Sequence, residues 1–125
     1  MDSLAYEELC LSAVLLDPAN IRVLSSELTS DKFQSPARRL IYEAMIDLHI
    51  SKVPIDIPTV VHQLGQNAEK AGGEGYLLQL KEKYGQLGVE SSQGLESWAR
   101  VVDAAGRLRH VSTVMAEYQP LYNDF

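Results

Sequence analysis

The three histidines are the side chains of this sequence best suited to binding a metal ion. His49, His62 and His110 lie far apart, and none has a second metal-ligating residue four positions away. A zinc site needs three or four ligands that converge on one point, and this spacing supplies no such set. We therefore expect no metal site. We interpret the histidines as surface or helix-end residues, with the side chain of His62 pointing outward.

A nucleotide site is suggested by the glycine-rich stretch Gly72-Gly73-Glu74-Gly75. However, a phosphate-binding P-loop requires a Gly-Lys pair followed by Ser or Thr, and the sequence contains no Gly-Lys pair. The dinucleotide-binding pattern also fails, since Leu78 occupies the place of its third glycine. We interpret these glycines as turn residues with positive φ ahead of a helix, and we expect no bound cofactor.

Nucleophilic and acid–base catalysis have no support in the sequence either. No serine lies in a Gly-x-Ser-x-Gly context, and the acidic residues are scattered rather than paired. The single cysteine, Cys10, lies between Leu9 and Leu11, where a small buried hydrophobic side chain is expected rather than a nucleophile. One cysteine excludes an intramolecular disulfide and suits a reducing compartment. We therefore predict a chain that is not an enzyme.

The C-terminal region carries the residues most suited to binding a partner. Its arginines lie close together near His110, opposed only by Asp103, which is typical of a solvated face or of a docking surface for an acidic partner. Nearby apolar residues recur at helical spacing, and they either complete the core or bind a second helix from another chain. The candidate interface residues are Arg100, Arg107, Leu108, Arg109, Val111, Met115 and Tyr118.

The composition indicates one ordinary globular domain. The chain has 125 residues and a net charge of −6, with 46% hydrophobic residues, which argues against disorder. Residues 1–96 carry eight basic and fourteen acidic side chains, whereas the remainder carries three of each. This balance argues against a surface that binds nucleic acid phosphates. No run of about 20 apolar residues or signal peptide is present, so we expect a soluble, cytoplasmic protein with no membrane partner.

The pattern of apolar residues predicts an all-α fold, a compact bundle of about six helices with a longer C-terminal helix. Breaks at Asp17-Pro18, Ser35-Pro36 and Asp56-Ile57-Pro58 separate the first four helices. Glycine-rich loops at 65–75 and 85–94 separate the last ones. We expect one domain over residues 1–125. Its bundle covers about 3–94, and a long helix, the start of a helical hairpin, covers 95–119, ending near Tyr118 with Pro120 as its stop. Gly106 lies within this last helix, so the helix is either weakened or closely packed there.

Six short segments, in a fixed order, carry a resemblance to a known family. They are 8–18, Leu28–Phe33, Ala37–Met45, Pro54–Asp56 with Thr59-Val60, Gly72-Gly73 with Tyr76-Leu77 and Leu80, and Trp98–Val102 with Arg109. Through them, residues 7 to 112 resemble the N-terminal domain of the bacterial replicative DNA helicase of the DnaB type. Ser12 stands where that family commonly has glycine, and Trp98 where it commonly has tyrosine.

The resemblance implies an all-α domain that precedes a RecA-like ATPase motor in a ring-shaped hexamer. In that family the domain self-associates as a dimer or in the hexameric collar, and its expected partners are primase and a helicase loader. ATP and Mg²⁺ belong to the motor domain, so the resemblance implies no cofactor here. Direct DNA binding is not expected, and weak, salt-sensitive binding through Arg100, Arg107 and Arg109 is the alternative.

Other interpretations of the sequence stay open. The chain is either an excised domain or a short stand-alone helical adaptor that lacks the motor. A primase C-terminal domain of the helicase-interacting kind has a similar helical fold, although the Pro54-Ile55-Asp56 segment favours the helicase side. A small all-α hydrolase is the remote alternative.

Overall fold

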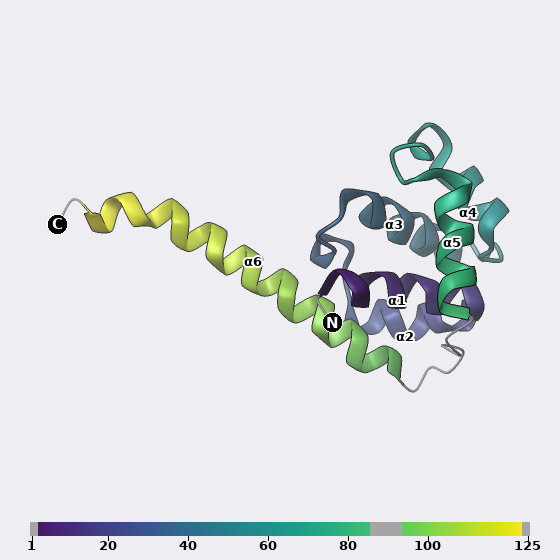
Figure 1. The fold of residues 1–125 in the computed structure, drawn as a ribbon, viewed down its shortest axis with the longest axis horizontal. Helices are drawn as coiled ribbons and strands as arrows, with labels where there is room; N and C mark the ends of the chain where they lie inside the picture. The colour runs from purple at the N-terminus through teal and green to yellow at the C-terminus, as the bar shows by residue number, and fades with distance from the viewer. Residues whose placement is uncertain (1–2, 86–93, 124–125) are drawn as a thin grey trace.

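The computed structural model describes the backbone of residues 3–85 and 94–123, and the side chains of 3–85 and 94–111. Within these ranges the chain forms six α-helices and no strand, as the sequence predicts (Figure 1). The α-helices are α1 (Ser3–Leu16), α2 (Ile21–Glu27), α3 (Pro36–Ile50), α4 (Ile57–Leu64), α5 (Gly73–Gly85) and α6 (Leu95–Asn123). Single 3₁₀ turns are η1 (Pro18–Asn20), η2 (Ser30–Lys32) and η3 (Gly65–Asn67).

Helix α1 is the centre of the bundle, because it is apolar on nearly every side. Residues 9 to 15 are all buried, and α1 packs against α3, α5 and α6. Its one interior hydroxyl is satisfied, since Ser12 Oγ donates to the carbonyl of Leu80 on α5 at 3.0 Å. A helix that is apolar on nearly every side needs neighbours around it, and these three helices supply them.

Proline and a capping side chain mark the helix starts. The Asp17 carboxylate accepts from Ala19 N ahead of η1, and the Ser35 hydroxyl accepts from Arg38 N at the start of α3. Asp56 and Thr59 exchange side-chain and backbone hydrogen bonds in a capping box at α4. The breaks expected from the sequence thus lie at helix starts, except that Asp17-Pro18 starts the 3₁₀ turn η1 and α2 begins only at Ile21.

The turn before α5 uses the predicted glycines. Gly72 and Gly73 have φ values of +96° and +71°, a region that residues with a Cβ rarely adopt. A Cβ on Gly72 would lie 2.8 Å from that of Tyr76, so the chain also passes too close for a side chain there. Residues 86–93 of the second predicted loop lie outside the described residues.

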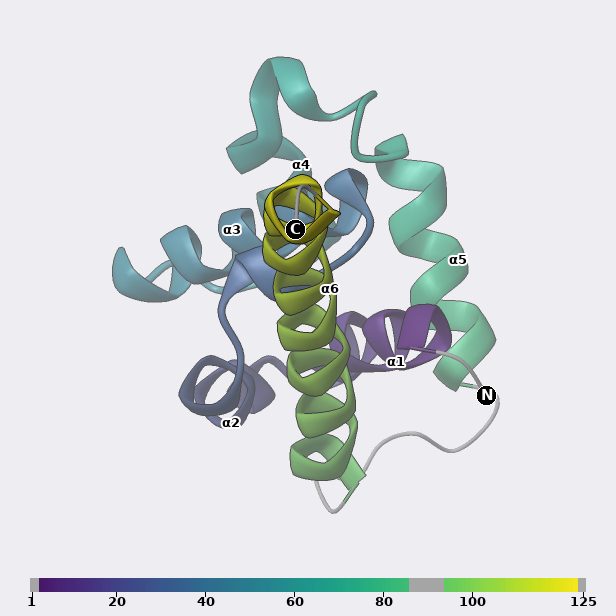
Figure 2. The ribbon, with the colours of Figure 1, turned by 90° about the vertical axis from the view of Figure 1, so that its left-hand side faces the viewer.

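Helix α6 crosses α1 and α2 and then continues away from the body (Figures 1 and 2). It reaches Asn123, so the expected end near Tyr118, with Pro120 as the stop, is wrong. A proline removes one amide donor but has a φ that suits the helix, so a helix can continue past it with one hydrogen bond fewer. In the described part of the chain, no helix is long and apolar enough to cross a membrane.

Candidate partner-binding surface

The inner face of α6 completes the hydrophobic core. Leu95, Ala99 and Val102 are fully buried against α1 and α2, as their spacing predicts, and Trp98 is partly buried beside them. These contacts fix the rotation of α6 about its axis. They therefore decide which of its other side chains face solvent.

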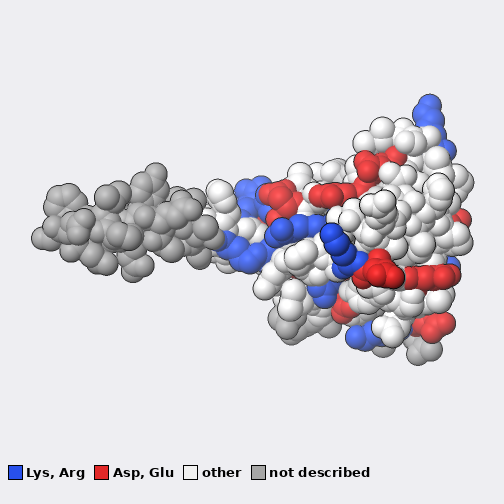
Figure 3. Space-filling model, turned by 90° about the horizontal axis from the view of Figure 1, so that it is seen from above, with Lys and Arg blue, Asp and Glu red and all other residues white. Residues whose placement is uncertain are grey.

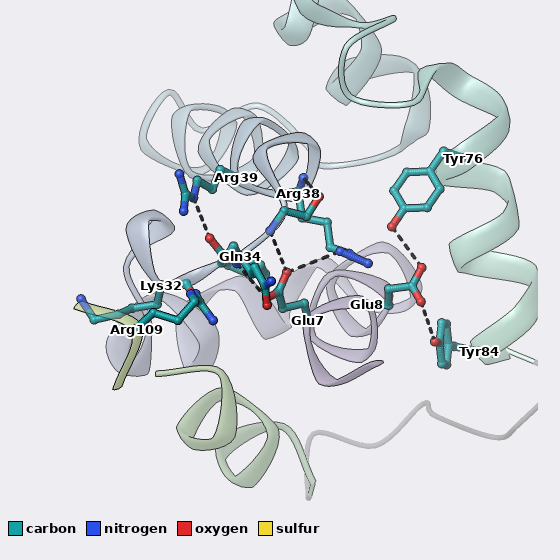
Figure 4. Close-up of polar contacts among 11 residues, drawn as sticks. Glu7, Glu8, Lys32, Gln34, Arg38, Arg39, Tyr76, Tyr84 and Arg109 are labelled. Atoms are coloured by element: carbon teal, nitrogen blue, oxygen red, sulfur yellow. Dashed lines mark hydrogen bonds and ion pairs between the residues drawn. The ribbon is translucent and has the colours of Figure 1, made fainter. Parts of the chain in front are cut away.

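Two further residues attach α6 to the 3₁₀ turn η2. A Cβ on Gly106 would lie 2.8 Å from the Cα of Lys32, so only glycine allows the two backbones to approach this closely. One turn further on, the Arg109 Nη2 donates to the Lys32 carbonyl at 2.6 Å (Figure 4). Of the two expectations for Gly106, close packing is the correct one.

The outer face of α6 carries an apolar stripe. Val101, Ala104, Leu108 and Val111 are exposed, with 67% exposure for Leu108 and 55% for Val111. Their alternating spacing of three and four residues keeps them on one side of a helix, the side away from Gly106. We call this set the outer stripe. Met115 and Tyr118 continue the same spacing along the helical backbone, but their side chains lie outside the described residues.

The structure separates the predicted basic residues into two places. The Arg100 guanidinium lies 3.7 Å from the carboxylate of Glu27 on α2 and 3.7 Å from that of Glu96, one turn earlier on α6. Arg107 and Arg109 lie a turn or more further along, and Arg107 forms an ion pair with Asp103 at 2.8 Å. Exposed pairs of this kind contribute about 1 kcal/mol or less, so a partner can replace them at little cost.

A groove lies where α6 leaves the body. It has a volume of about 800 Å³ and is lined by residues of η2, α3 and α6, which are Asp31, Lys32, Arg39, Gly106, Arg107, Arg109, His110 and Val111. We call it the basic groove. The sequence analysis found the α6 residues but missed Lys32 and Arg39. No local pattern links Lys32 and Arg39 to the α6 residues, because they lie far apart in the sequence. Only the close approach of η2 to α6 brings these side chains together.

A buried carboxylate holds α3 in place, and the sequence analysis did not foresee it. Glu7 has no exposed surface, and its carboxylate accepts from Gln34 N at 2.8 Å and from Ser35 N at 3.4 Å (Figure 4). Arg38 lies 3.5 Å away from the same carboxylate. The negative charge thus lies at the N-terminus of α3, where backbone N–H groups favour it. The partners of Glu7 lie 27 to 31 residues away in the sequence, so the local pattern around it does not point to this contact.

The neighbouring Glu8 holds α5 to α1. Its two carboxylate oxygens accept from the hydroxyls of Tyr76, at 3.0 Å, and Tyr84, at 3.2 Å (Figure 4). Burial raises the pKa of Tyr76 to about 12, and burial together with the Glu8 charge raises the pKa of Tyr84. Both phenols therefore stay protonated and act as hydrogen-bond donors at neutral pH.

The residues considered for catalysis or metal binding lie on four different helices, with Cys10 on α1, His49 on α3, His62 on α4 and His110 on α6. Cys10 is fully buried, and burial, with the nearby Glu7 charge, raises the pKa of its thiol to about 12. His62 and His110 are exposed and His49 is half-buried. Among the described side chains, those of residues 3–85 and 94–111, no three His, Cys, Asp or Glu residues are grouped as metal ligands.

Comparison with known families gives one match that covers most of the chain. Residues 1–104 match the family model described as the DnaB-like helicase N-terminal domain. The crystal structure of the N-terminal domain of DnaB helicase from Mycobacterium tuberculosis superposes with a TM-score of 0.83 at 25% identity. That match covers 95% of this chain and 84% of the other.

Curated relatives are similar over the same region. The replicative DNA helicase DnaB of Geobacillus stearothermophilus is 31% identical over 111 residues, which is 87% of this chain. The replicative DNA helicase DnaC of Bacillus subtilis (strain 168) is 28% identical over 107 residues, or 84% of this chain. The chain spans 23% of the length of the first relative and 22% of the second.

Proposed function

The chain belongs to the family of DnaB-like helicase N-terminal domains, and on that basis we propose that it is a non-catalytic assembly domain of a replicative ring helicase. In this role the domain associates with further copies of itself and docks primase and a helicase loader. ATP hydrolysis and DNA translocation take place in a motor domain of the same helicase.

The outer stripe is the observation that supports assembly most directly. Exposed Val101, Leu108 and Val111 follow a heptad spacing on a helix whose opposite side is already buried in the core. Burial of each such side chain against a second helix contributes about 1.5–3 kcal/mol. A monomer gains nothing from keeping this stripe in water, so a helix–helix contact between copies accounts for it.

Light scattering coupled to size-exclusion chromatography tests the proposal over a series of concentrations. We expect the full chain to form dimers or larger assemblies, and we expect Leu108→Asp to shift it to monomer, because a carboxylate would be placed in the apolar contact. Leu78→Asp is the matched control, since Leu78 is also exposed, at 43%, but lies on α5. A chain that stays monomeric at high micromolar concentration contradicts assembly through this domain alone.

Primase docking is tested separately by calorimetric titration of the chain with the C-terminal domain of the cognate primase. We expect saturable binding with a defined stoichiometry. Binding of intact helicase hexamers in place of primase would instead favour the primase-like interpretation.

A further inference from the structure

The basic groove has a fixed arrangement of cations. Arg39 Nε donates to the Phe33 carbonyl at 2.6 Å, and Arg109 Nη2 donates to the Lys32 carbonyl at 2.6 Å. A guanidinium carries five N–H donors, so a bond to a backbone carbonyl orients it and still allows it several partners at once. Figure 3 shows Lys and Arg side chains gathered where α6 leaves the body. The groove therefore presents oriented donors in a protein whose net charge is −6.

The groove has an excess of positive charge. Four Lys and Arg side chains line it, whereas Asp31 is the one carboxylate among the lining residues. Asp31 forms an ion pair with Lys32 at 2.8 Å, and the Asp103 that pairs with Arg107 belongs to α6 itself. These exposed pairs are weak and exchangeable. The excess charge favours an anionic occupant.

The groove also has an apolar edge, which favours an acidic peptide over a nucleic acid as the anionic occupant. Val111 lines the groove and is 55% exposed. A phosphate backbone has no apolar surface to cover this side chain, and no Phe, Tyr or Trp stands among the lining residues to stack on a base. An acidic peptide with apolar residues on one side can satisfy both the cations and the apolar edge.

We propose that the basic groove binds an acidic, amphipathic segment of a partner protein. Carboxylates of that segment pair with Arg107, Arg39 and Lys32, and its apolar side chains cover Val111. This surface goes beyond the proposed assembly role, because it lies beside the outer stripe and has its own charge. It gives the domain a second binding surface, selective for negative charge.

Fluorescence anisotropy with the full chain tests the proposal with three labelled probes. The first is an 18-residue peptide with Glu and Leu at helical spacing, the second has Gln in place of every Leu, and the third is an 18-nucleotide oligo-dT. We expect the Glu/Leu peptide to bind at least about tenfold more tightly than either other probe. Binding should weaken as the salt concentration rises.

Arg107→Glu and Lys81→Glu form the matched pair of variants. Both residues are exposed helix cations, but Lys81 lies on α5 outside the groove. We expect Arg107→Glu to weaken peptide binding by about tenfold and Lys81→Glu to change it by less than about twofold. Since Arg107 is outside the outer stripe, Arg107→Glu should leave the assembly mass unchanged, whereas Leu108→Asp tests assembly independently.

Four outcomes overturn the proposal. Equal binding of all three probes would indicate a general anion surface, and tighter binding of oligo-dT would indicate a nucleic acid surface. Absence of binding by the Glu/Leu peptide, or equal weakening by Arg107→Glu and Lys81→Glu, would show that the groove does not hold an acidic segment.

Discussion

Gly106 is the residue where the absence of a side chain matters most to the architecture. An added Cβ would lie 2.8 Å from the Lys32 Cα, so Gly106→Ala must push α6 away from η2. Alanine gains about 1 kcal/mol in helix propensity, but overpacking against backbone costs about 1–3 kcal/mol. We expect a net loss of about 1 kcal/mol in the free energy of unfolding, measured by urea denaturation.

Gly75→Ala is the matched control for that substitution. Gly75 lies in α5, has a negative φ, and an added Cβ would meet nothing within 4 Å. We expect it to be neutral or to stabilise the protein by up to about 1 kcal/mol. If both substitutions stabilise the protein equally, the close contact at Lys32 is not a constraint.

Cys10 gives the stability a dependence on alkaline pH. Burial raises the thiol pKa from 9.0 to about 12 in the folded chain. Between these values the unfolded chain loses the proton and the folded chain keeps it, so stability is full below about pH 9 and falls as pH rises. We expect the free energy of unfolding to drop by about 1 kcal/mol between about pH 9 and pH 10.

The Cys10→Ala variant isolates that effect. It is less stable at every pH because it creates a cavity, but it should lack the part of the decline that the thiol causes. The measurement is a series of urea denaturation curves for both proteins across this pH range. Identical slopes for the two would show that the thiol is not responsible.

At the scale of elements, the helix starts could be predicted because their causes are local. Asp17-Pro18, Ser35-Pro36 and the Asp56 capping box each combine a side-chain cap with a proline whose φ suits the first turn. Only neighbouring residues take part, so a short window of sequence is enough. The end at Pro120 failed as a prediction because proline also tolerates a continuing helix.

The polar contacts between elements could not be predicted in the same way. Glu7 binds the backbone of residues 34 and 35, and Lys32 meets Gly106 and Arg109, so each contact spans many residues. The periodicity of apolar residues indicates which side of a helix is buried. It does not indicate which polar groups of other elements contact that helix. The sequence therefore pointed to the α6 residues that line the basic groove, Arg107, Arg109 and Val111, but not to Lys32 and Arg39.

The contribution of the Glu7 contacts to stability is testable. Glu7→Ala leaves the Gln34 and Ser35 amides and the Arg38 guanidinium without a buried carboxylate. Loss of one member of such a buried pair costs about 3 kcal/mol, so we expect that loss in the free energy of unfolding. Glu82→Ala, on the exposed side of α5, should stay within about 0.5 kcal/mol. Equal effects of the two would contradict the role assigned to Glu7.

At the scale of the whole molecule, α6 serves two purposes. Its first turns supply part of the core, while its later turns run away from the body (Figure 1). The sequence predicted a net acidic domain, and the structure concentrates cations in the basic groove at the point where these two parts meet. The core contacts of α6 and its proposed partner surfaces therefore lie mainly on different turns of one helix.

Truncation should separate the contribution of α6 to folding from its proposed contribution to self-association. A chain of residues 1–94 loses the buried Leu95, Ala99 and Val102, and the two larger side chains alone contribute about 1.5–3 kcal/mol each. It also loses the Arg109 bond to Lys32. Since small domains are stable by only about 5–15 kcal/mol, we expect no cooperative thermal unfolding from this fragment.

A chain of residues 1–111 keeps every one of those contacts. We expect its free energy of unfolding, measured at a concentration where the full chain is monomeric, to lie within about 1 kcal/mol of that of the full chain. Its self-association should be weaker, because the outer stripe ends at Val111 and no longer continues to Met115 and Tyr118. Calorimetry and light scattering on the same samples check both expectations. A cooperative transition in 1–94 would show that α6 is not part of the folding unit, and unchanged association of 1–111 would confine the contact to Val101–Val111.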